Sequence, residues 1–351
     1  MSFPRICFID TYYPEVLRAF DKEHPEWPTL PYEDRLQQVL ESLFGTADYY
    51  SRNLRLLGWD ALDMIANYQG LQGSGDPVSA ALGQIEQYRP DVLFLQDLGF
   101  LPAAAVSQLR SQGILIAAQL SCPLPPRDRL SGPQVIFTSF PHYVDLLPTL
   151  GAGRVVYSAL ACEPSAIDRT LNGQPAPERD IDVLFVGGVG KNIHWHAGTE
   201  ALEALAREFG PRFQWYGYGP QWLEADSPLR NVYRGEAWGR DMYHLLLRAK
   251  VVVNRHGEVA QGYANNMRLF EATSAGALLV TEAAPNLGDF FGPDEALSYG
   301  PGELPEKVRW ALANPAEAAA IAARGQTRAL TERTYFKKMQ QVDAVLREGL
   351  R

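Results

Sequence analysis

The segment NNMRLFEATSAG (265–276) carries a cation and a carboxylate at the spacing of one helical face. Arg268 and Glu271 are three positions apart, so a helix would project both side chains from the same side. Asn265 and Asn266 favour a helix N-terminus, where backbone N–H groups point outward at the positive end of the helix dipole. These N–H groups and Arg268 suit a diphosphate, and Glu271 suits a pair of ribose hydroxyls. The alternative is an ordinary Arg–Glu surface pair.

A glycine-rich turn ends the apolar run DVLFVGG (182–188). Gly187 and Gly188 would let a phosphate approach the backbone, and Lys191 and His194 follow closely enough to complement its charge. The spacing matches neither the G-x-G-x-x-G dinucleotide pattern nor the Walker pattern, so a dinucleotide or ATP site is not predicted. The alternative is a tight strand-to-helix turn with solvated histidines.

Five further candidates also lie at the ends of apolar runs or at the start of a helical pattern. A flat nucleotide base could stack on Tyr216, which ends a run of aromatics, although core packing is the alternative for this residue. Trp238 and Gly239 open a helical pattern. Asn254 and His256 come directly after the run KVVVN, an unusual placement for a plain connection. We expect both to contact a ligand.

These residues need a parallel sheet to bring them together. Continuous Val, Ile, Leu and Phe runs predict strands that are buried on both faces, and helical patterns follow most of them. This alternation predicts an α/β fold, in which ligands bind beyond the carboxyl ends of the strands. The expected strands are residues 6–10, 91–96, 113–120, 134–139, 154–159, 182–188, 213–217, 250–254 and 277–282. The expected helices are residues 32–44, 78–88, 199–209, 239–250, 265–276, 305–314, 315–330 and 331–350.

The length of 351 residues suits two domains of about 150 residues each. Prolines, a glycine and charges replace the apolar runs around residues 162–180, as is typical of an exposed linker. We therefore expect two Rossmann-like α/β domains joined by a linker and followed by a final helical segment. Their expected bounds are residues 1–165, 166–179, 180–328 and 329–351.

Composition excludes several classes of protein. With 32 Lys and Arg against 41 Asp and Glu, the net charge is -9, and no basic stripe favours nucleic-acid binding. The three cysteines, Cys7, Cys122 and Cys162, have no C-x-x-C spacing, so neither a disulfide framework nor a cysteine zinc site is predicted. No apolar run reaches the roughly 18 residues of a membrane span, and the N-terminus reads as a strand, not a signal. We expect a cytoplasmic protein without an integral membrane segment.

The order of four segments resembles the C-terminal half of bacterial glycosyltransferases of the spore-maturation CgeB-like group, related to glycosyltransferase group 1 and family 4. The segments are DVLFVGG, EAWG with DMY, KVVVNRHG and NMRLFEATSAGALLVTE. Such enzymes have the GT-B architecture of two facing Rossmann-like domains with parallel sheets, a cleft between them and a C-terminal crossover helix. The resemblance covers about residues 180–345. In the first half it is limited to an element pattern, best matched at residues 55–67 and 88–97.

The resemblance implies a role for each candidate in binding a nucleotide sugar. The implied contacts are the donor phosphates for Gly187, Gly188 and Lys191, the base for Trp238 and Gly239, the donor sugar or phosphate for Asn254 and His256, the diphosphate for Asn266 and Arg268, and the ribose for Glu271. Related enzymes often carry another glutamate eight positions before the last one, where this chain has Tyr263. The identity of the sugar is therefore left open. The resemblance also implies that the final helix returns to the N-terminal, acceptor-side domain.

Glycosyl transfer develops negative charge on the departing diphosphate. Lys191, Arg255 and Arg268 are expected to form a positive pocket that stabilises this charge without a metal, and no D-x-D metal signature with strand context is present. No cofactor is expected beyond the nucleotide-sugar donor.

An inverting enzyme also needs a base from the N-terminal domain, and the candidates at strand ends are Asp10, Asp97 and His142. Each of these residues has helix capping as its structural alternative. A retaining enzyme would need none of them, and His256 is a further catalytic candidate.

Two other functions fit the same architecture. One is a sugar-nucleotide epimerase or a phosphorylase, and the other is a non-catalytic two-domain sugar-binding protein. The acceptor is unknown and could be a glycan, a protein or a small molecule. Aromatic residues of the first domain are a candidate acceptor platform, with core packing as the alternative: Tyr12, Tyr13, Trp27, Tyr49, Tyr50 and Trp59.

Overall fold

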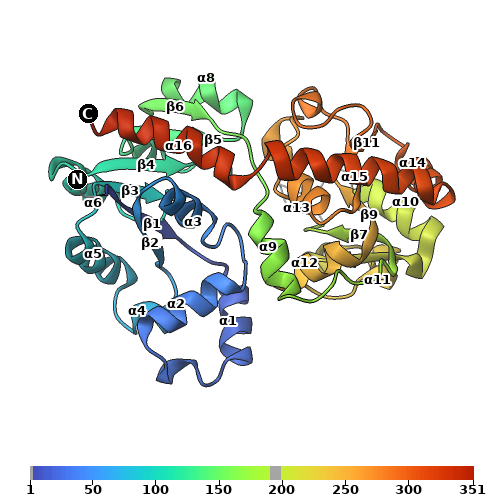
Figure 1. Ribbon diagram of the computed structural model, residues 1–351, viewed down its shortest axis with the longest axis horizontal. Helices are drawn as coiled ribbons and strands as arrows, with labels where there is room; N and C mark the ends of the chain where they lie inside the picture. The colour runs from blue at the N-terminus through green and yellow to red at the C-terminus, as the bar shows by residue number, and fades with distance from the viewer. Residues whose placement is uncertain (1–2, 190–198) are drawn as a thin grey trace. The chain divides into compact units, whose positions relative to one another are not determined.

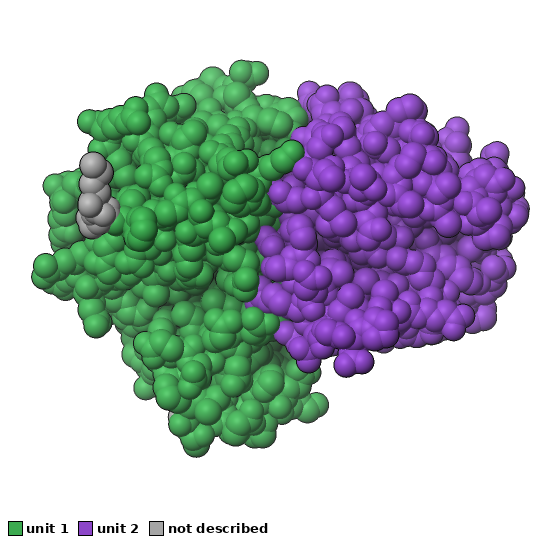
Figure 2. Space-filling view, viewed as in Figure 1, with its two compact units in different colours: residues 1–159, 335–351 green, residues 160–334 purple. Residues whose placement is uncertain are grey.

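The computed structural model describes residues 3–189 and 199–351 and divides into two compact units (Figures 1 and 2). Unit 1 comprises residues 1–159 and 335–351, and unit 2 comprises residues 160–334. Each unit is built on one parallel sheet flanked by helices. Within the described ranges, no helix is both long enough and apolar enough to cross a membrane.

The sheet of unit 1 has the strand order β2-β1-β3-β4-β5-β6, with every neighbouring pair parallel. The strands are β1 (Arg5–Asp10), β2 (Asp60–Ile65), β3 (Val92–Leu95), β4 (Leu115–Gln119), β5 (Val135–Thr138) and β6 (Arg154–Tyr157). The helices are α1 (Pro14–Glu23), α2 (Tyr32–Glu41), α3 (Tyr49–Leu56), α4 (Gln69–Gln72), α5 (Pro77–Tyr88), α6 (Ala103–Ser111), α7 (Arg127–Leu130), α8 (Pro141–Thr149) and α16 (Tyr335–Gly349). The chain places β2 on one side of β1 and then returns to place β3 on the other side, so the topological switch point lies between β1 and β3.

The sheet of unit 2 has the strand order β11-β10-β9-β7-β8, again parallel throughout. The strands are β7 (Ile181–Val186), β8 (Phe213–Tyr216), β9 (Ala249–Asn254), β10 (Leu278–Glu282) and β11 (Leu297–Tyr299). The helices are α9 (Pro164–Leu171), α10 (Thr199–Phe209), α11 (Leu229–Val232), α12 (Gly239–Arg248), α13 (Arg268–Ser274), α14 (Leu304–Ala313) and α15 (Pro315–Glu332). Short 3-10 helices are η1 (Trp27–Thr29) in unit 1 and η2 (Gly210–Arg212), η3 (Pro220–Trp222), η4 (Glu258–Ala260) and η5 (Leu287–Asp289) in unit 2. The switch point of this sheet lies between β7 and β9.

All nine expected strands are present, and the structure adds β2 and β11. The sequence DALDMI of β2 includes two aspartates and lacks a continuous apolar run. One of them, Asp63, is buried because its carboxylate accepts hydrogen bonds from Ser51 and Arg55. Strand β11 has only three residues and pairs with β10 alone. Both strands therefore lack the signal of a strand buried on two apolar faces.

The unit boundaries differ from the expected domain bounds, because part of the expected linker is helical. Glu163 caps α9 by accepting a hydrogen bond from the backbone N–H of Ser165 at 3.1 Å, and Pro164 occupies the first helical position. Helix α9 then packs against α12 within unit 2. The backbone N–H of Cys162 donates to the carbonyl of Arg333 at 2.8 Å, so the chain enters and leaves unit 2 side by side.

The aromatic residues expected as an acceptor platform form core instead. Five of the six are buried, and four of these, all but Trp59, have their rings against other aromatic rings of unit 1: Tyr12, Trp27, Tyr49, Tyr50 and Trp59. Only Tyr13 is exposed, at 53%. The platform hypothesis is therefore wrong for these five side chains, because burial of their large apolar area stabilises unit 1.

The last helix, α16, belongs to unit 1 and packs along α3. The ring of Tyr335 lies 5.1 Å from that of Tyr49, centroid to centroid. The buried ammonium of Lys338 donates to the carbonyl of Ser158 at 3.1 Å, to its hydroxyl at 3.0 Å, and to the carbonyl of Ala159 at 3.0 Å. Lys338 thus ties the final helix to the chain just after β6.

Replacing Lys338 by methionine should lower the free energy of unfolding by about 1–3 kcal/mol. Methionine keeps the apolar stem, so the loss comes from the Ser158 carbonyl and hydroxyl, which are left buried without this donor. Urea unfolding compared with the wild type checks the prediction. The matched control is Lys337→Met at the neighbouring exposed position, and equal unfolding midpoints for the two variants would contradict the anchoring role.

Candidate functional site

The carboxyl edge of the unit 2 sheet brings together most of the residues predicted from the sequence. Gly187 and Gly188 follow β7, Tyr216 ends β8, and Asn254 ends β9. Because β7 and β9 are neighbours, the glycine turn and Asn254 flank the switch point, where open α/β sheets bind ligands. Lys191 and His194 lie outside the described residues.

The start of α13 lies at the same edge. The side-chain amide of Asn266 donates to Asn254 Oδ1 and to the carbonyl of Arg255, both at 2.7 Å. The guanidinium of Arg268 reaches the carbonyl of Val186, the last residue of β7, at 3.4 Å. These contacts place α13 between the ends of β7 and β9, so Arg268 lies at the switch point.

Arg268 and Glu271 form a buried ion pair. Their guanidinium nitrogen and carboxylate oxygen are 2.5 Å apart, and the side chains are 16% and 6% exposed. Burial raises the pKa of the Glu271 carboxyl, and the neighbouring Arg268 charge opposes that shift. Arg268 also contacts the sulfur of Met242 on α12. The pair is therefore not exposed as an ordinary surface pair would be: Glu271 is buried and Arg268 is largely buried, and buried charges are usually paired.

The backbone N–H groups expected to hold a diphosphate are largely occupied. Helix α13 begins at Arg268, three residues later than the expected start. The N–H of Leu269 donates to Asn266 Oδ1 at 3.3 Å, and those of Phe270 and Glu271 both donate to the carbonyl of Met267 at 3.0 Å. The bond from Glu271 is the first ordinary bond of the helix, and the expectation of free N–H groups is wrong at Leu269 and Phe270.

Asn254 and Asn266 act as a clamp within the protein. Asn254 is buried, and its amide donates to the hydroxyl of Thr281 at 2.9 Å while its oxygen accepts from Asn266. The amide of Asn266 is shared between two acceptors, so both side chains are used in joining β9, β10 and α13. Asn265 precedes this clamp and is partly exposed.

Arg255 is hydrogen-bonded to the glycine turn. It is buried, donates to the carbonyl of Gly188, and lies 5.6 Å from the centroid of the Phe185 ring. Burial lowers the pKa of its guanidinium to about 10. The expectation that Arg255 lines a positive pocket is therefore corrected: its donors are directed into the protein, where they stabilise the end of β7.

Glycines at this edge allow close packing of backbone and aromatic rings. A Cβ atom at Gly188 would lie 2.5 Å from the ring of Tyr218, and one at Gly217 would lie 2.1 Å from the carbonyl oxygen of Gly187. The ring of Tyr218 stacks on that of Trp238, with centroids 6.0 Å apart and planes 11° from parallel. Any side chain at Gly188 would displace this stack.

The residues predicted to contact the nucleotide base include Trp238, which is part of this stack. The indole N–H of Trp238 donates to Glu236 at 3.0 Å, and the residue is partly exposed. Gly239 begins α12 with a φ of 48°, a left-handed conformation that glycine adopts without strain. The hydroxyl of Tyr216 donates to Gln214 at 3.4 Å. The aromatic stack is the surface on which a flat base could lie.

His256 packs against the end of β10. Its backbone N–H donates to the carboxylate of Glu282 at 3.1 Å, and its ring Nε2 lies 3.0 Å from the carbonyl oxygen of the same residue. Burial lowers the pKa of the imidazole. Glu282 and Thr281 end β10 and were not among the predicted residues. The sequence carries a signal for both residues, because they are the last two residues of the expected strand at 277–282.

Two of the three candidate bases in unit 1 lie at its switch point. Asp10 ends β1, and Asp97 follows β3, which neighbours β1. Thr11 links them, because its hydroxyl donates to Asp97 at 2.7 Å and its backbone N–H donates to Asp10 at 2.8 Å. Burial raises the pKa of Asp10 to about 7, with the charges of Asp97 and Asp63 contributing to the shift.

The third candidate, His142, is not brought to the same point. It lies in the first turn of α8, after β5, and β4 separates β5 from β3. Its ring stacks on that of Phe140 at 5.3 Å, and burial lowers its pKa. The other oxygen of Asp97 accepts the N–H of Gly99 at 2.7 Å, so Asp97 is engaged at both oxygens. Asp10 is therefore the best placed of the three.

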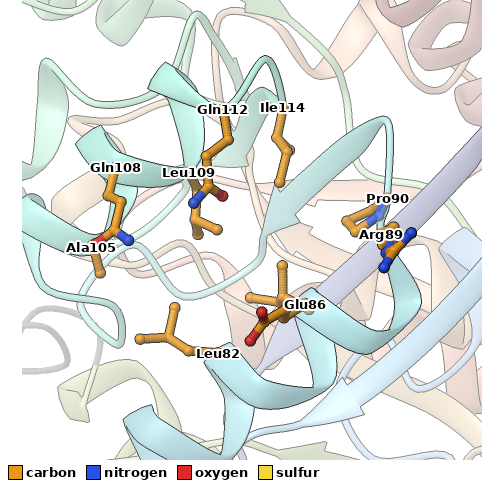
Figure 3. A pocket seen from close by; sticks show the side chains of 10 residues that line it. Leu82, Glu86, Arg89, Pro90, Ala105, Gln108, Leu109, Gln112 and Ile114 are labelled. Carbon is orange, nitrogen blue, oxygen red and sulfur yellow. The ribbon is translucent and has the colours of Figure 1, made fainter.

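Two cavities lie at the opposite, amino edges of the sheets. One, of about 520 Å³, lies between α5 and α6 in unit 1, near Pro90 and Ile114, which precede β3 and β4 (Figure 3). The other, of about 540 Å³, is lined by Asp182 and Lys250 near the starts of β7 and β9 and by alanines of α15. None of the candidate site residues lines either cavity. In residues 3–189 and 199–351, no group of three or more His, Cys, Asp or Glu residues is arranged to hold a metal ion.

Comparisons with known proteins find one family model and a set of solved structures that are similar to this chain. Residues 198–344 match a family model described as glycosyl transferase-like, which includes both Arg268 and Glu271. No curated protein matches the chain.

Solved structures match the chain over nearly its whole length. Sucrose-phosphate synthase from Thermosynechococcus elongatus aligns with a TM-score of 0.59 at 16% identity, over 98% of each chain. A glycosyltransferase from Rickettsia africae aligns with a TM-score of 0.58 at 11% identity, over 100% of this chain and 99% of the other. HepE from Anabaena, solved in complex with UDP-glucose, aligns with a TM-score of 0.55 at 14% identity, over 98% and 99%. The chain therefore has the two Rossmann-like domains of the GT-B glycosyltransferase fold.

Proposed function

We propose that the protein transfers a sugar from a nucleoside-diphosphate donor to a glycan, protein or small-molecule acceptor, with unit 2 binding the donor. The observation that carries the proposal is the buried Arg268–Glu271 pair at the switch point of the unit 2 sheet. A guanidinium suits a diphosphate, and a carboxylate suits a pair of ribose hydroxyls. Both groups are held where this class of sheet binds nucleotides.

Two comparisons support the same reading. The glycosyl transferase-like match covers the segment that contains the pair, and the structurally similar HepE was solved with UDP-glucose. Within the superfamily, the order of motifs from DVLFVGG to NMRLFEATSAGALLVTE favours the CgeB-like group. We therefore propose that this protein belongs to the CgeB-like group.

Loss of the diphosphate is the step that unit 2 would assist. Negative charge grows on the leaving group as the glycosidic bond breaks, and a positioned cation stabilises that charge more in the transition state than in the ground state. Arg268 is positioned by Val186 and Glu271, and Lys191 is the second cation in the proposal. We propose that these two side chains serve in place of a divalent metal.

An acceptor hydroxyl must lose its proton if the reaction inverts the sugar. A general base works best when its pKa lies near the working pH. Asp10 meets this condition with a pKa of about 7, and it lies at the switch point of unit 1. We propose Asp10 as that base, with its pKa raised mainly by burial and further by the charge of Asp97.

The donor site predicts which substitutions weaken binding. A thermal-shift panel of UDP-, GDP- and dTDP-sugars is expected to identify a stabilising donor that the wild type slowly hydrolyses. Glu271→Ala and Arg268→Ala should each weaken binding of that donor by roughly 1–3 kcal/mol in calorimetry, because each removes a charge-assisted hydrogen bond.

The matched control is the exposed Arg309–Glu208 pair of the same unit, whose atoms are 2.8 Å apart. Alanine at either of these positions should leave donor binding unchanged. Unaltered affinity in folded Glu271→Ala protein would refute the donor site. Stabilisation by a free monosaccharide and by no nucleotide would instead indicate a sugar-binding protein.

Turnover should be insensitive to metal chelation. Because Arg268 and Lys191 carry the leaving-group charge in this proposal, donor hydrolysis measured with and without EDTA should proceed at the same rate. Loss of activity in EDTA and its recovery with added Mn²⁺ or Mg²⁺ would show that a metal performs this role.

Asp10→Asn should change stability in a pH-dependent way. The folded-state pKa of Asp10 is raised from 3.8 to about 7, so the native state keeps a proton that the unfolded state releases. Wild-type stability should therefore fall relative to the variant as pH rises from about 4 to about 7, by on the order of 1–4 kcal/mol in total. Chemical unfolding at pH 4 and pH 8 measures the difference, and an equal difference at both would exclude the raised pKa.

The same variant tests the catalytic role. Asp10→Asn should abolish transfer while donor affinity stays within twofold, since the donor contacts are assigned to unit 2. Full activity of the variant would exclude Asp10 as the base and would favour a retaining reaction.

A further inference from the structure

His256 is a buried imidazole whose two ring nitrogens have different surroundings. The residue is 8% exposed and follows β9 at the carboxyl edge of the unit 2 sheet. Glu282 holds it twice, through the backbone N–H at 3.1 Å and through ring Nε2, which lies 3.0 Å from the Glu282 carbonyl oxygen. The orientation of the ring is therefore determined by the end of β10.

These contacts determine which nitrogen carries the proton. A carbonyl oxygen only accepts hydrogen bonds, so Nε2 must be the protonated nitrogen. Burial disfavours the imidazolium, which keeps the ring neutral near pH 7. Nδ1 consequently carries a lone pair and acts only as an acceptor.

Nδ1 is buried and has no hydrogen-bond partner among the residues that the structure describes. Buried polar atoms are nearly always hydrogen-bonded, so an exception beside a proposed ligand site requires an explanation. The simplest source of the missing donor is the ligand, because the recorded hydrogen bonds from the amides of the adjoining clamp run to Thr281, to Asn254 and to Arg255, and none runs to this ring.

The chemistry of an acceptor selects the part of the ligand. At neutral pH the phosphate groups of a nucleoside-diphosphate sugar are themselves acceptors and have no proton to give to Nδ1. Hydroxyls of the ribose and of the donor sugar can each donate one, and the proposed function already assigns the ribose hydroxyls to Glu271. The geometry also separates the two parts, since Arg268 contacts the end of β7 while His256 contacts the end of β10, on the other side of β9.

We propose that Nδ1 of His256 accepts a hydrogen bond from a hydroxyl of the donor sugar, and that this ring therefore binds the sugar and not the diphosphate. The inference rests on the proposed function and deepens it, by assigning the sugar contact to the β9–β10 side of the site. His256 is then a specificity-determining residue that requires a hydroxyl at one position of the sugar ring.

Two substitutions of His256 test the contributions of the two ring nitrogens separately. In His256→Gln the side-chain amide reaches the place of Nε2, so the contact to the Glu282 carbonyl can persist while the acceptor at Nδ1 is lost. In His256→Asn an amide oxygen can take the place of Nδ1. His244→Gln, at an exposed position of α12, is the matched control.

Calorimetry would use whichever of three pairs binds the wild type most tightly: UDP with UDP-glucose, GDP with GDP-mannose, or dTDP with dTDP-glucose. His256→Gln should weaken the nucleotide sugar by about 5- to 30-fold and leave the nucleoside diphosphate within twofold. His256→Asn should recover part of the loss, and His244→Gln should have no effect. Equal weakening of both ligands, or of neither, would overturn the proposal. Binding of none of the pairs would refute the proposed function itself.

A second test replaces the sugar hydroxyl instead of the imidazole. Deoxy analogues of the bound donor should include one that binds the wild type more weakly, and His256→Gln should not weaken that analogue further. In wild-type protein, the ¹⁵N resonance of the unprotonated Nδ1 should shift on addition of the nucleotide sugar and not of the nucleoside diphosphate. An Nδ1 resonance that responds equally to both ligands would contradict the assignment.

Discussion

The hydrogen bond between the amides of Asn254 and Asn266 is the interaction on which the site depends. It joins the end of β9 to the residues that start α13, and a second bond from Asn254 to Thr281 adds the end of β10. Three elements that follow one another along the chain are thereby held at one edge of the sheet. The hydrogen bonds of both amides run within the protein, so we assign these asparagines a positioning role and the proposed ligand contacts to their neighbours.

The clamp positions the oppositely charged side chains of Arg268 and Glu271, which are largely buried. Arg268 and Glu271 are each stabilised by the other, since an isolated charge at this depth would be strongly disfavoured. A ligand that offers a diphosphate to the cation and hydroxyls to the carboxylate would satisfy both groups again. The same edge offers a neutral acceptor at His256, held by Glu282 on the next strand. The charged pair therefore lies on the β7 side of β9, and the neutral acceptor lies on the β10 side.

The two units use one topological rule for different chemistry. In unit 2 the switch point lies between β7 and β9 and carries the ion pair, whereas in unit 1 it lies between β1 and β3 and carries two carboxyl groups. Burial is the main reason for the raised pKa of Asp10, and the nearby charge of Asp97 adds to it because like charges close together favour the protonated form of one of them. Opposite charges and like charges at equivalent places suit leaving-group stabilisation and proton transfer, respectively.

The sequence by itself determined the fold class and most of the edge residues, because continuous apolar runs mark strands buried on both faces and ligand groups follow such strands. Only the tertiary structure decided the use of each side chain. It placed Arg255 and five aromatic residues in packing roles, occupied the N–H groups of α13, revealed β2 and β11, and added Glu282 as the support of His256. The reason is that a strand end specifies where a side chain begins, whereas the neighbouring strands and helices specify what it touches.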